Sequence, residues 1–246
     1  FYRGFKVLCR KAMMVVTLRA YCEETGLSFT SLAPESFIFY PAKPEESERE
    51  QFIEAFNRAA ELEGSRHVWI LKPSDGGKGQ NILVMDDLEQ ITDHLDGQAE
   101  GSISWVVQKY MERPLLLTGE RKFDMRVWVL LMPDYSIYVY SEGVLRTGCT
   151  RYDLDDLSDT FTHLSNHCIA VDHPDYGKFE PTNEMWYDQF DAHLQKVSGG
   201  TVSFDDTIAP QIEALVAHTM RAARPQMETG ATDRARYGCF NVFGFD

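Results

Sequence analysis

The sequence lacks long apolar runs and any excess of positive charge. No apolar stretch in its 246 residues approaches the length of a membrane-spanning helix, and no signal peptide is visible. Lysine and arginine number 24 against 38 aspartates and glutamates, which gives a formal net charge of −14. This balance argues against general nucleic-acid binding. We therefore expect neither a membrane nor a nucleic acid as a partner.

Cysteine is also scarce, and its spacing excludes two common uses of the residue. The five cysteines contain no CxxC pair and no zinc-type spacing. Their odd number and scatter indicate free thiols in a reducing cytosol, so we expect a cytoplasmic protein. His163 and His167 lie four residues apart but have no acidic third ligand nearby, which favours structural or ligand-contact roles over a metal pair. The cysteines are Cys9, Cys22, Cys149, Cys168 and Cys239.

The hydrophobic content of 43% is enough for one large or two modest domains. The order of elements predicts an α+β fold with antiparallel pairs and not an alternating βαβ order. Asn183 is expected to cap the helix that follows it. Strands are expected at 37–40, 67–72, 81–85, 103–109, 122–132, 137–146 and 239–245. Helices are expected at 11–21, 52–63, 86–95, from 183 onward, and at 208–223.

The charges of one predicted strand are its most informative feature. Residues 123, 125, 127, 129 and 131 are all apolar and share one strand face, because side chains alternate with period two. Lys122, Asp124 and Arg126 share the other face. This pattern suits a site that handles phosphates, a metal and a carboxylate together. It is equally typical of a solvated strand face with cross-strand salt bridges, and these residues alone leave both interpretations open.

The segment after this strand predicts a hairpin with a three-residue turn at 133–135. An odd loop length keeps Glu142 and Arg146 on the same face as Arg126. The predicted opposite pairs are Arg126 with Glu142, Lys122 with Arg146, Val129 with Val139, and Leu131 with Ile137.

Three further segments have polar groups suited to nucleotide contacts. The glycine-rich loop 72–79 lacks the features of a P-loop but suits a flap over phosphates, while a mobile hairpin tip is the simpler interpretation. The strand end at 106–111 suits an adenine pocket, or is a strand that reaches the surface. The segment 162–168 suits ribose or phosphate contacts, or is a turn whose polar groups hydrogen-bond to one another. Asp246, at the end of a strand, is of the type that binds Mg²⁺.

In their order along the chain, these segments resemble the tubulin tyrosine ligase family of the ATP-grasp enzymes. The resemblance covers nearly the whole chain and is closest to the tyrosine-adding member of the family. It is carried by these runs: Tyr2-Arg3-Gly4, Val68 to Lys72, Gln108-Lys109-Tyr110, Arg121 to Asp124, Glu142 to Thr147, His163 to Cys168, Asn183-Glu184-Met185 and Phe243 to Asp246.

The resemblance implies an ATP-grasp fold of mixed and antiparallel sheets with flanking helices, and nucleotide bound between two sheets. It places the end of an N-terminal domain and the start of a central domain at 1–66. The central ATP-grasp domain is expected at 67–117, with the glycine-loop flap and the adenine-binding strand. An incomplete C-terminal ATP-grasp domain is expected at 118–246.

The activity implied is ATP-dependent addition of tyrosine to the C-terminal glutamate of detyrosinated α-tubulin, through an acyl phosphate. Alternatives are addition of glutamate or glycine to tubulin, or tubulin binding without catalysis. The cofactors implied are ATP and Mg²⁺, and the partners are tubulin and a free amino acid.

The resemblance also assigns roles to individual residues. Arg126 and Arg146 would position carboxylates, since a guanidinium binds a carboxylate bidentately. Lys11, Lys72 and Lys122 would hold ATP phosphates, and Asp246 would bind Mg²⁺. The remaining nucleotide contacts would come from Gln108, Lys109, Tyr110, Met111, Asp124, Ser165 and Asn166.

Two departures from the family pattern matter. The family usually has a basic residue before Glu142, where this chain has Ser141, which affects local contacts to the acceptor or the amino acid. The family's further metal ligands, a Glu and an Asn, follow the Phe-Gly-Phe-Asp run, beyond Asp246. We therefore expect residues 1–246 alone to bind Mg-ATP poorly and not to ligate.

Overall fold

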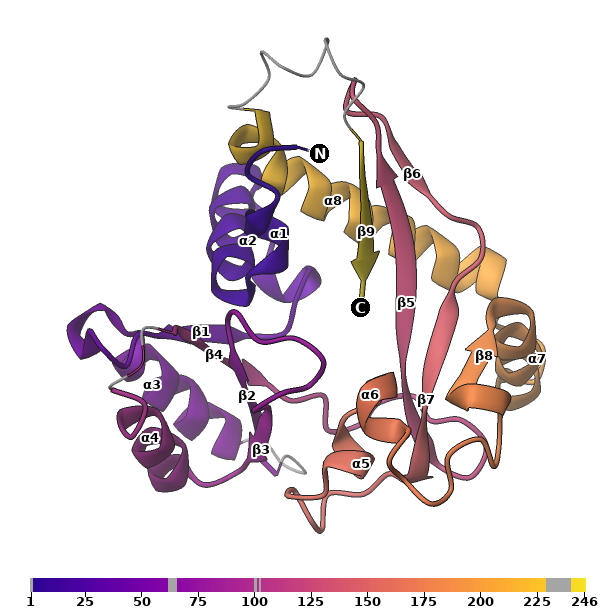
Figure 1. Ribbon diagram of the computed structural model, residues 1–246, viewed down its shortest axis with the longest axis horizontal. Helices are drawn as coiled ribbons and strands as arrows, with labels where there is room; N and C mark the ends of the chain where they lie inside the picture. The colour runs from indigo at the N-terminus through magenta and orange to yellow at the C-terminus, as the bar shows by residue number, and fades with distance from the viewer. Residues whose placement is uncertain (1, 62–65, 100, 102, 229–239) are drawn as a thin grey trace. The chain divides into compact units, whose positions relative to one another are not determined.

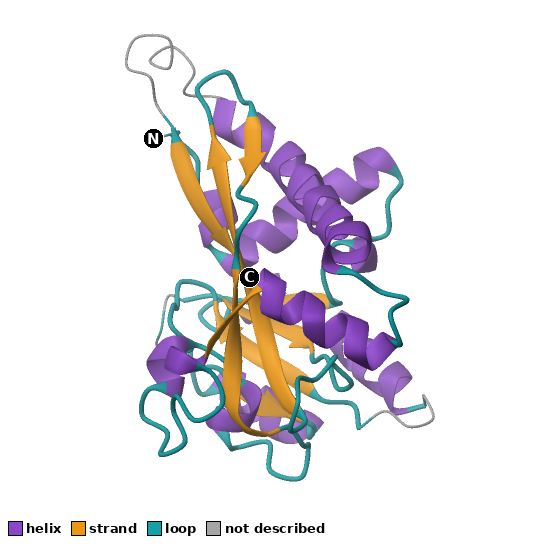
Figure 2. Cartoon of the chain, turned by 90° about the vertical axis from the view of Figure 1, so that its right-hand side faces the viewer, coloured by secondary structure: helices purple, strands orange, loops and turns teal. Residues whose placement is uncertain are grey.

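The computed structural model describes residues 2–61, 66–99, 101, 103–228 and 240–246. The chain divides into two compact units (Figure 1). We call Lys6–Pro114 with Leu154–Asp159 the N-terminal unit. The C-terminal unit comprises the described residues before Lys6, Leu115–Asp153, and those from Thr160 onward. Strands in both units are flanked by helices (Figure 2), as an α+β fold requires.

The N-terminal unit is a four-stranded antiparallel sheet with helices on both faces. Its strand order is β1 (Ser36–Phe39), β4 (Trp105–Lys109), β2 (Trp69–Pro73) and β3 (Leu83–Met85). Helices α3 (Arg49–Ala60) and α4 (Leu88–Asp96) pack on one face around the fully buried Phe52 and Trp69. Helix α2 (Lys11–Thr25) packs on the other face, through Ala12 and Val15 against Ile38 and Val106. The short helix α1 (Lys6–Cys9) precedes it.

The C-terminal unit is built on the long strand β5 (Arg121–Leu131). Its sheet has the order β6 (Ile137–Val139), β5, β7 (Val144–Arg151) and β8 (Glu184–Trp186), and β9 (Asn241–Phe245) also pairs with β5. All of these pairs are antiparallel. The helices are α5 (Thr160–His163), α6 (His167–Ala170), α7 (Tyr187–Ser198) and α8 (Ala209–Glu228). Short turns of 3-10 and π-helix lie at Pro181–Asn183 and Phe204–Ile208.

The apolar face of β5 packs as its alternation predicts. Phe123 and Met125 contact a core formed with Leu145 and with Phe190 and Leu194 of α7. Farther along β5, Val127, Val129 and Leu131 are buried. The opposite face of β5 therefore presents Lys122, Asp124 and Arg126, as the sequence predicts.

The predicted hairpin register is confirmed at the turn and wrong beyond it. Val129 pairs with Val139 and Leu131 with Ile137, as expected. Beyond the turn, Arg126 pairs with Val144 instead of Glu142, and Asp124 with Arg146. The cause is that 141–143 leave the ladder after Tyr140 N donates to Trp128 O at 2.9 Å, which shifts the register by two residues and preserves the faces.

Gly143 lies just before the point at which pairing with β5 resumes, and other segments approach its backbone closely. A Cβ at this position would lie 2.8 Å from the carbonyl oxygen of Arg126 and 2.1 Å from the hydroxyl of Tyr187. No side chain fits in that space, so this position requires glycine.

Two further expectations about local structure change. Asn183 does not cap α7, because it lies in the turn before β8, with its side chain buried. Helix α3 ends at Ala60, and the predicted extension to 63 enters residues outside those described. Asp87 caps helix α4, since its carboxylate accepts a hydrogen bond from Gln90 N.

The described cysteines are all free thiols, while Cys239 lies outside the described residues. Among the described helices, none is both long and apolar enough to cross a bilayer.

Candidate functional site

The polar face of β5 carries a connected group of charged side chains. Asp124 lies opposite Arg146 of β7, and its Oδ1 accepts a hydrogen bond from Arg146 Nε at 2.6 Å. Its Oδ2 accepts from Ser165 Oγ at 2.5 Å. Three segments that are distant in sequence thus meet at one carboxylate, which favours a site over a plain surface ladder.

Two arginines of this face converge on the carboxylate of Asp246. Arg126 binds it bidentately through Nε and Nη2, the latter at 2.9 Å from Oδ2. Arg146 Nη2 lies 3.1 Å from Asp246 Oδ1. A carboxylate held between two guanidinium groups is the geometry expected of a carboxylate-binding site.

Gly244 leaves room for this arrangement. It lies two residues before Asp246 in β9, and a Cβ there would come within 3.0 Å of Arg126 Cδ. A larger residue would therefore press directly on the arginine side chain.

Lys122 lies on the same face, and its pKa is strongly lowered. Its Nζ donates a hydrogen bond to the carbonyl oxygen of His163 at 2.7 Å. Burial lowers the pKa of Lys122 to about 8, although the charge of nearby Asp124 acts in the opposite direction. A partly buried ammonium with a lowered pKa gains from an anion such as a phosphate, because the anion replaces lost hydration.

Arg146 is held as a cation by its acidic neighbours. Burial opposes its charge, but Asp124 and Asp246 outweigh that effect and raise the pKa of Arg146. The remaining predicted residue of this unit, Asn166, precedes α6, and its side chain does not cap that helix.

In the N-terminal unit, the structure joins Lys72 and Gln108 across adjacent strands. Lys72 Nζ donates to Gln108 Oε1 at 2.7 Å, and Gln108 Nε2 donates to Ser36 Oγ at 2.9 Å. The chain Lys72–Gln108–Ser36 crosses β2, β4 and β1 on one face of the sheet. It places the predicted phosphate lysine beside the start of the predicted adenine-binding segment.

The other residues of that segment differ in exposure and contacts. Lys109 Nζ donates to Val68 O at 2.9 Å, pairs with Glu112, and lies 5.7 Å from the centroid of the Trp69 ring. Tyr110 is buried, whereas Met111 is 60% exposed. The Lys109 side chain therefore stabilises the end of β4 itself.

Lys11 lies against the glycine-rich loop. Its Nζ donates to the carbonyl oxygens of Pro73 at 3.0 Å and Gly76 at 2.6 Å. The side chain of Ser74 accepts from Ala12 N at 3.0 Å, which ties the same loop to the start of α2. Burial lowers the pKa of Lys11, and the charge of Asp75 partly offsets this. Lys11 thus anchors the base of the loop, a role that the sequence does not indicate.

Mg²⁺ is usually held by one or two carboxylates together with phosphate oxygens, so the described side chains could supply only part of its ligands. No three acidic, histidine or cysteine side chains among them could hold a metal ion together. Asp246, the predicted ligand, is already bound to Arg126 and Arg146, and these two cations oppose a third positive charge at the same oxygens. Mg²⁺ binding stays a prediction.

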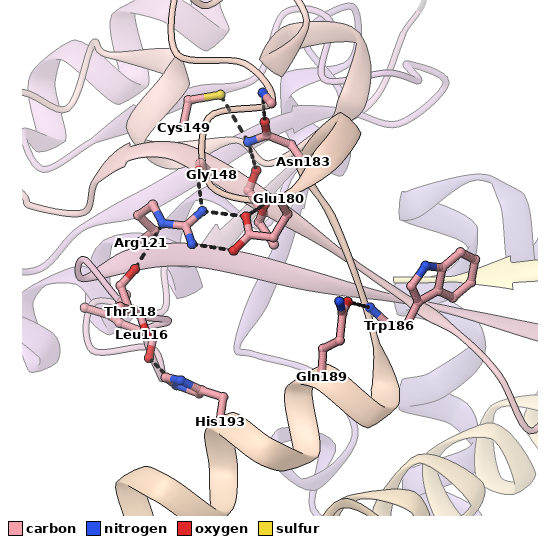
Figure 3. Close-up of polar contacts among 12 residues, drawn as sticks. Leu116, Thr118, Arg121, Gly148, Cys149, Glu180, Asn183, Trp186, Gln189 and His193 are labelled. Atoms are coloured by element: carbon pink, nitrogen blue, oxygen red, sulfur yellow. Dashed lines mark hydrogen bonds and ion pairs between the residues drawn. The ribbon is translucent and has the colours of Figure 1, made fainter.

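Sequence reasoning gave no role to the buried pair of Arg121 and Glu180. The guanidinium of Arg121 is only 2% exposed and donates to both oxygens of Glu180 (Figure 3). The one signal in the sequence is that Arg121 continues the alternating pattern of β5 onto the apolar face, where a charge needs a partner.

Comparison with known proteins identifies the family. The model of the tubulin-tyrosine ligase family matches residues 2–246, which is nearly the whole chain. The chain belongs to the tubulin-tyrosine ligase family. The resemblance carried by the Lys122–Asp124–Arg126 strand is thereby confirmed at the level of the family, and the α+β fold agrees with it.

Similar members of the family carry names that specify glycine. The chain is 33% identical to human protein monoglycylase TTLL8 over 79% of its length, and 31% identical to human tubulin monoglycylase TTLL3 over 80%. It is 28% identical to tubulin glycylase 3B of Tetrahymena thermophila over 91% of its length. The matches cover 23%, 26% and 19% of these relatives, so the chain spans at most about a quarter of each. These relatives do not bear out the expected closeness to the tyrosine-adding member.

Proposed function

We propose that this chain belongs to an ATP-dependent ligase that adds glycine to tubulin. The observation that carries the proposal is its similarity, above 30% identity, to two human proteins named as monoglycylases. Glycine addition was an alternative to tyrosine on the sequence alone, and the named relatives favour it. Free thiols at the described cysteines support a reducing, cytoplasmic setting.

The proposed reaction joins the amine of glycine to a carboxylate of tubulin. A carboxylate oxygen attacks the γ-phosphorus of ATP and ADP leaves, which gives an acyl phosphate. The glycine amine then attacks the acyl carbon, an amide bond forms, and inorganic phosphate and a proton leave. No protein nucleophile is required, so the residues act by position and charge.

The charged face of β5 supplies groups suited to these steps. Lys122 would bind a transferring phosphate, because its partly buried ammonium gains from an added negative charge. Arg126 and Arg146 would hold the carboxylate of the acceptor or of glycine, as they hold Asp246 in this structure. Lys72 and Gln108 of the N-terminal unit would contact the nucleotide.

Ser141 stands where the family usually has a basic residue, beside Glu142 and close in sequence to Arg146. The departure is from the family as a whole, so it bears on local contacts to the acceptor or the amino acid and does not favour one amino acid over another.

The test is a ligase assay on the full-length protein with tubulin, Mg-ATP and labelled glycine, tyrosine or glutamate in separate reactions. We expect incorporation of glycine only. Lys122→Met should abolish it, whereas the matched variant Lys196→Met, at an exposed lysine of α7, should not. Incorporation of tyrosine or glutamate instead would refute the choice of amino acid. No incorporation of any of the three would favour a tubulin-binding protein without ligase activity.

A further inference from the structure

A buried ion pair lies on the opposite face of β5 from Lys122 and Arg126. Arg121 Nη1 and Nη2 bind the two oxygens of Glu180 at 2.8 and 2.6 Å. Arg121 also donates to Thr118 O at 3.0 Å and Gly148 O at 3.2 Å, and its guanidinium lies 4.0 Å from the Phe179 ring centroid. This arginine therefore fixes several backbone segments at once (Figure 3).

Glu180 and Asn183 extend these contacts to β7. Thr147 is fully buried, and its hydroxyl donates to Glu180 Oε2 at 2.8 Å. Asn183 Nδ2 donates to Thr147 O at 2.8 Å and lies 3.3 Å from Cys149 Sγ. The hydroxyl and the carbonyl of Thr147 are thus both held by one segment. We call Arg121, Thr147, Glu180 and Asn183 the Glu180 network.

The Glu180 network adjoins an irregularity in the β5–β7 ladder. Phe123 pairs with Thr147 and Arg121 with Arg151, so two steps along β5 correspond to four along β7. The extra residues include Gly148, whose carbonyl Arg121 binds. A Cβ on Gly148 would lie 3.1 Å from Lys122 O, so the backbones pass closely there. Such bulges change the direction of neighbouring side chains.

The segment that carries Glu180 and Asn183 is held in an unfavourable conformation. Thr182 and Asn183 have φ angles of 59° and 52°, in the left-handed region that non-glycine residues avoid. Asn183 tolerates this region better than the β-branched Thr182. Strain of this kind persists where surrounding contacts over-determine the backbone, and it is common beside functional sites.

We propose that the Glu180 network is a positioning device for Arg146, the residue that precedes Thr147. Arg146 pairs with Glu184, which directly follows Asn183, so the network fixes β7 from both neighbouring strands. The direction in which the Arg146 side chain points then depends on Glu180 and Thr147, although these two residues do not lie on the charged face with Arg146. This inference rests on the proposed function in one respect, because that function supplies the substrate carboxylate that Arg146 would bind.

Kinetics of the full-length protein test the network through substitutions that preserve shape. Thr147→Val and Glu180→Gln should raise the KM for tubulin or glycine about tenfold or more, because small displacements of a binding group have effects of this size. The KM for ATP should not change. Thr147→Ser restores the hydroxyl and should behave like the wild type. Glu120→Gln, in the exposed ion pair with Arg151, is the matched control.

These kinetics separate positioning from loss of folded protein. A purely structural role would lower the fraction of active enzyme and leave every KM unchanged. That result, or an equal change in the KM for ATP, would overturn the proposal.

Hydrogen exchange tests the network independently of catalysis. Glu180→Gln should speed amide exchange in residues 144–149 relative to Glu120→Gln, with exchange in α7 unchanged. Equal exchange in the two variants would refute the network. If the wild type adds no amino acid to tubulin, the proposed function fails, and this measurement still decides the role of Glu180.

Discussion

Replacing Lys122 by methionine should stabilise the fold at neutral pH while removing the charge that we propose binds a phosphate. Burial lowers the pKa of Lys122 from 10.5 to about 8, and a shift of that size corresponds to about 3 kcal/mol of unfavourable free energy in the charged, folded state. Methionine removes this cost but also loses the hydrogen bond to His163 O, worth about 1–2 kcal/mol when the carbonyl loses its partner. The net expectation is a variant about 1–2 kcal/mol more stable at pH 7.

The difference in stability between the wild type and Lys122→Met should change sign with pH. Between pH 8 and 10.5 the unfolded chain keeps a proton on Lys122 that the folded chain has lost, so wild-type stability rises with pH across that window. Methionine does not titrate. The variant should therefore be more stable than the wild type below pH 8 and less stable near pH 10.5.

Urea unfolding of both proteins across this pH range is the assay, with Lys196→Met as the control at an exposed lysine. A stability difference between wild type and Lys122→Met that does not vary with pH would refute the reasoning.

Three other perturbations test separate features. Arg126→Lys replaces a bidentate fork by a single ammonium and should raise the KM for a carboxylate substrate at least tenfold in the ligase assay; an unchanged KM would contradict its role. Asp87→Ala removes the cap of α4 and should lower the free energy of unfolding by about 1 kcal/mol, measured by urea, whereas no loss would mean the cap is dispensable. Burial alone would raise the pKa of Glu180, but hydrogen bonds from Arg121 and Thr147 lower it overall, so its stabilisation is present above about pH 4.5 and is lost on acidification. Wild type should therefore lose more stability than Glu180→Gln between pH 5 and pH 3, and parallel losses would exclude this effect.

The faces of β5 could be predicted from sequence because alternation is a local property. Lys122, Asp124 and Arg126 share one face in the structure, and the apolar residues between and beyond them pack into the core or are buried. Period-two alternation needs no knowledge of any other segment.

The pairing of those residues could not be predicted in the same way. Arg126 lies opposite Val144, because residues 141–143 leave the ladder, and Gly143 in this stretch lies against Tyr187. That contact joins segments more than forty residues apart, and no local pattern encodes it.

The partner of Arg121 could not be predicted from the sequence for a related cause. The alternation of β5 places Arg121 on the apolar face, where its charge needs a partner, but it does not indicate which residue that partner is. The partner, Glu180, lies 59 residues away in an irregular segment. The same holds for Asn183, whose polar type and position suggested a helix cap, although its side chain binds β7.

Mass measurement of tubulin tails tests the central claim most directly. The full-length protein is incubated with tubulin, Mg-ATP and an equimolar mixture of glycine, tyrosine and glutamate, and the tails are then analysed by mass spectrometry. We predict mass increments that correspond to glycine residues and that disappear in Lys122→Met but persist in Lys196→Met. Increments that correspond to tyrosine or glutamate, or unmodified tails with the wild-type protein, would contradict the account.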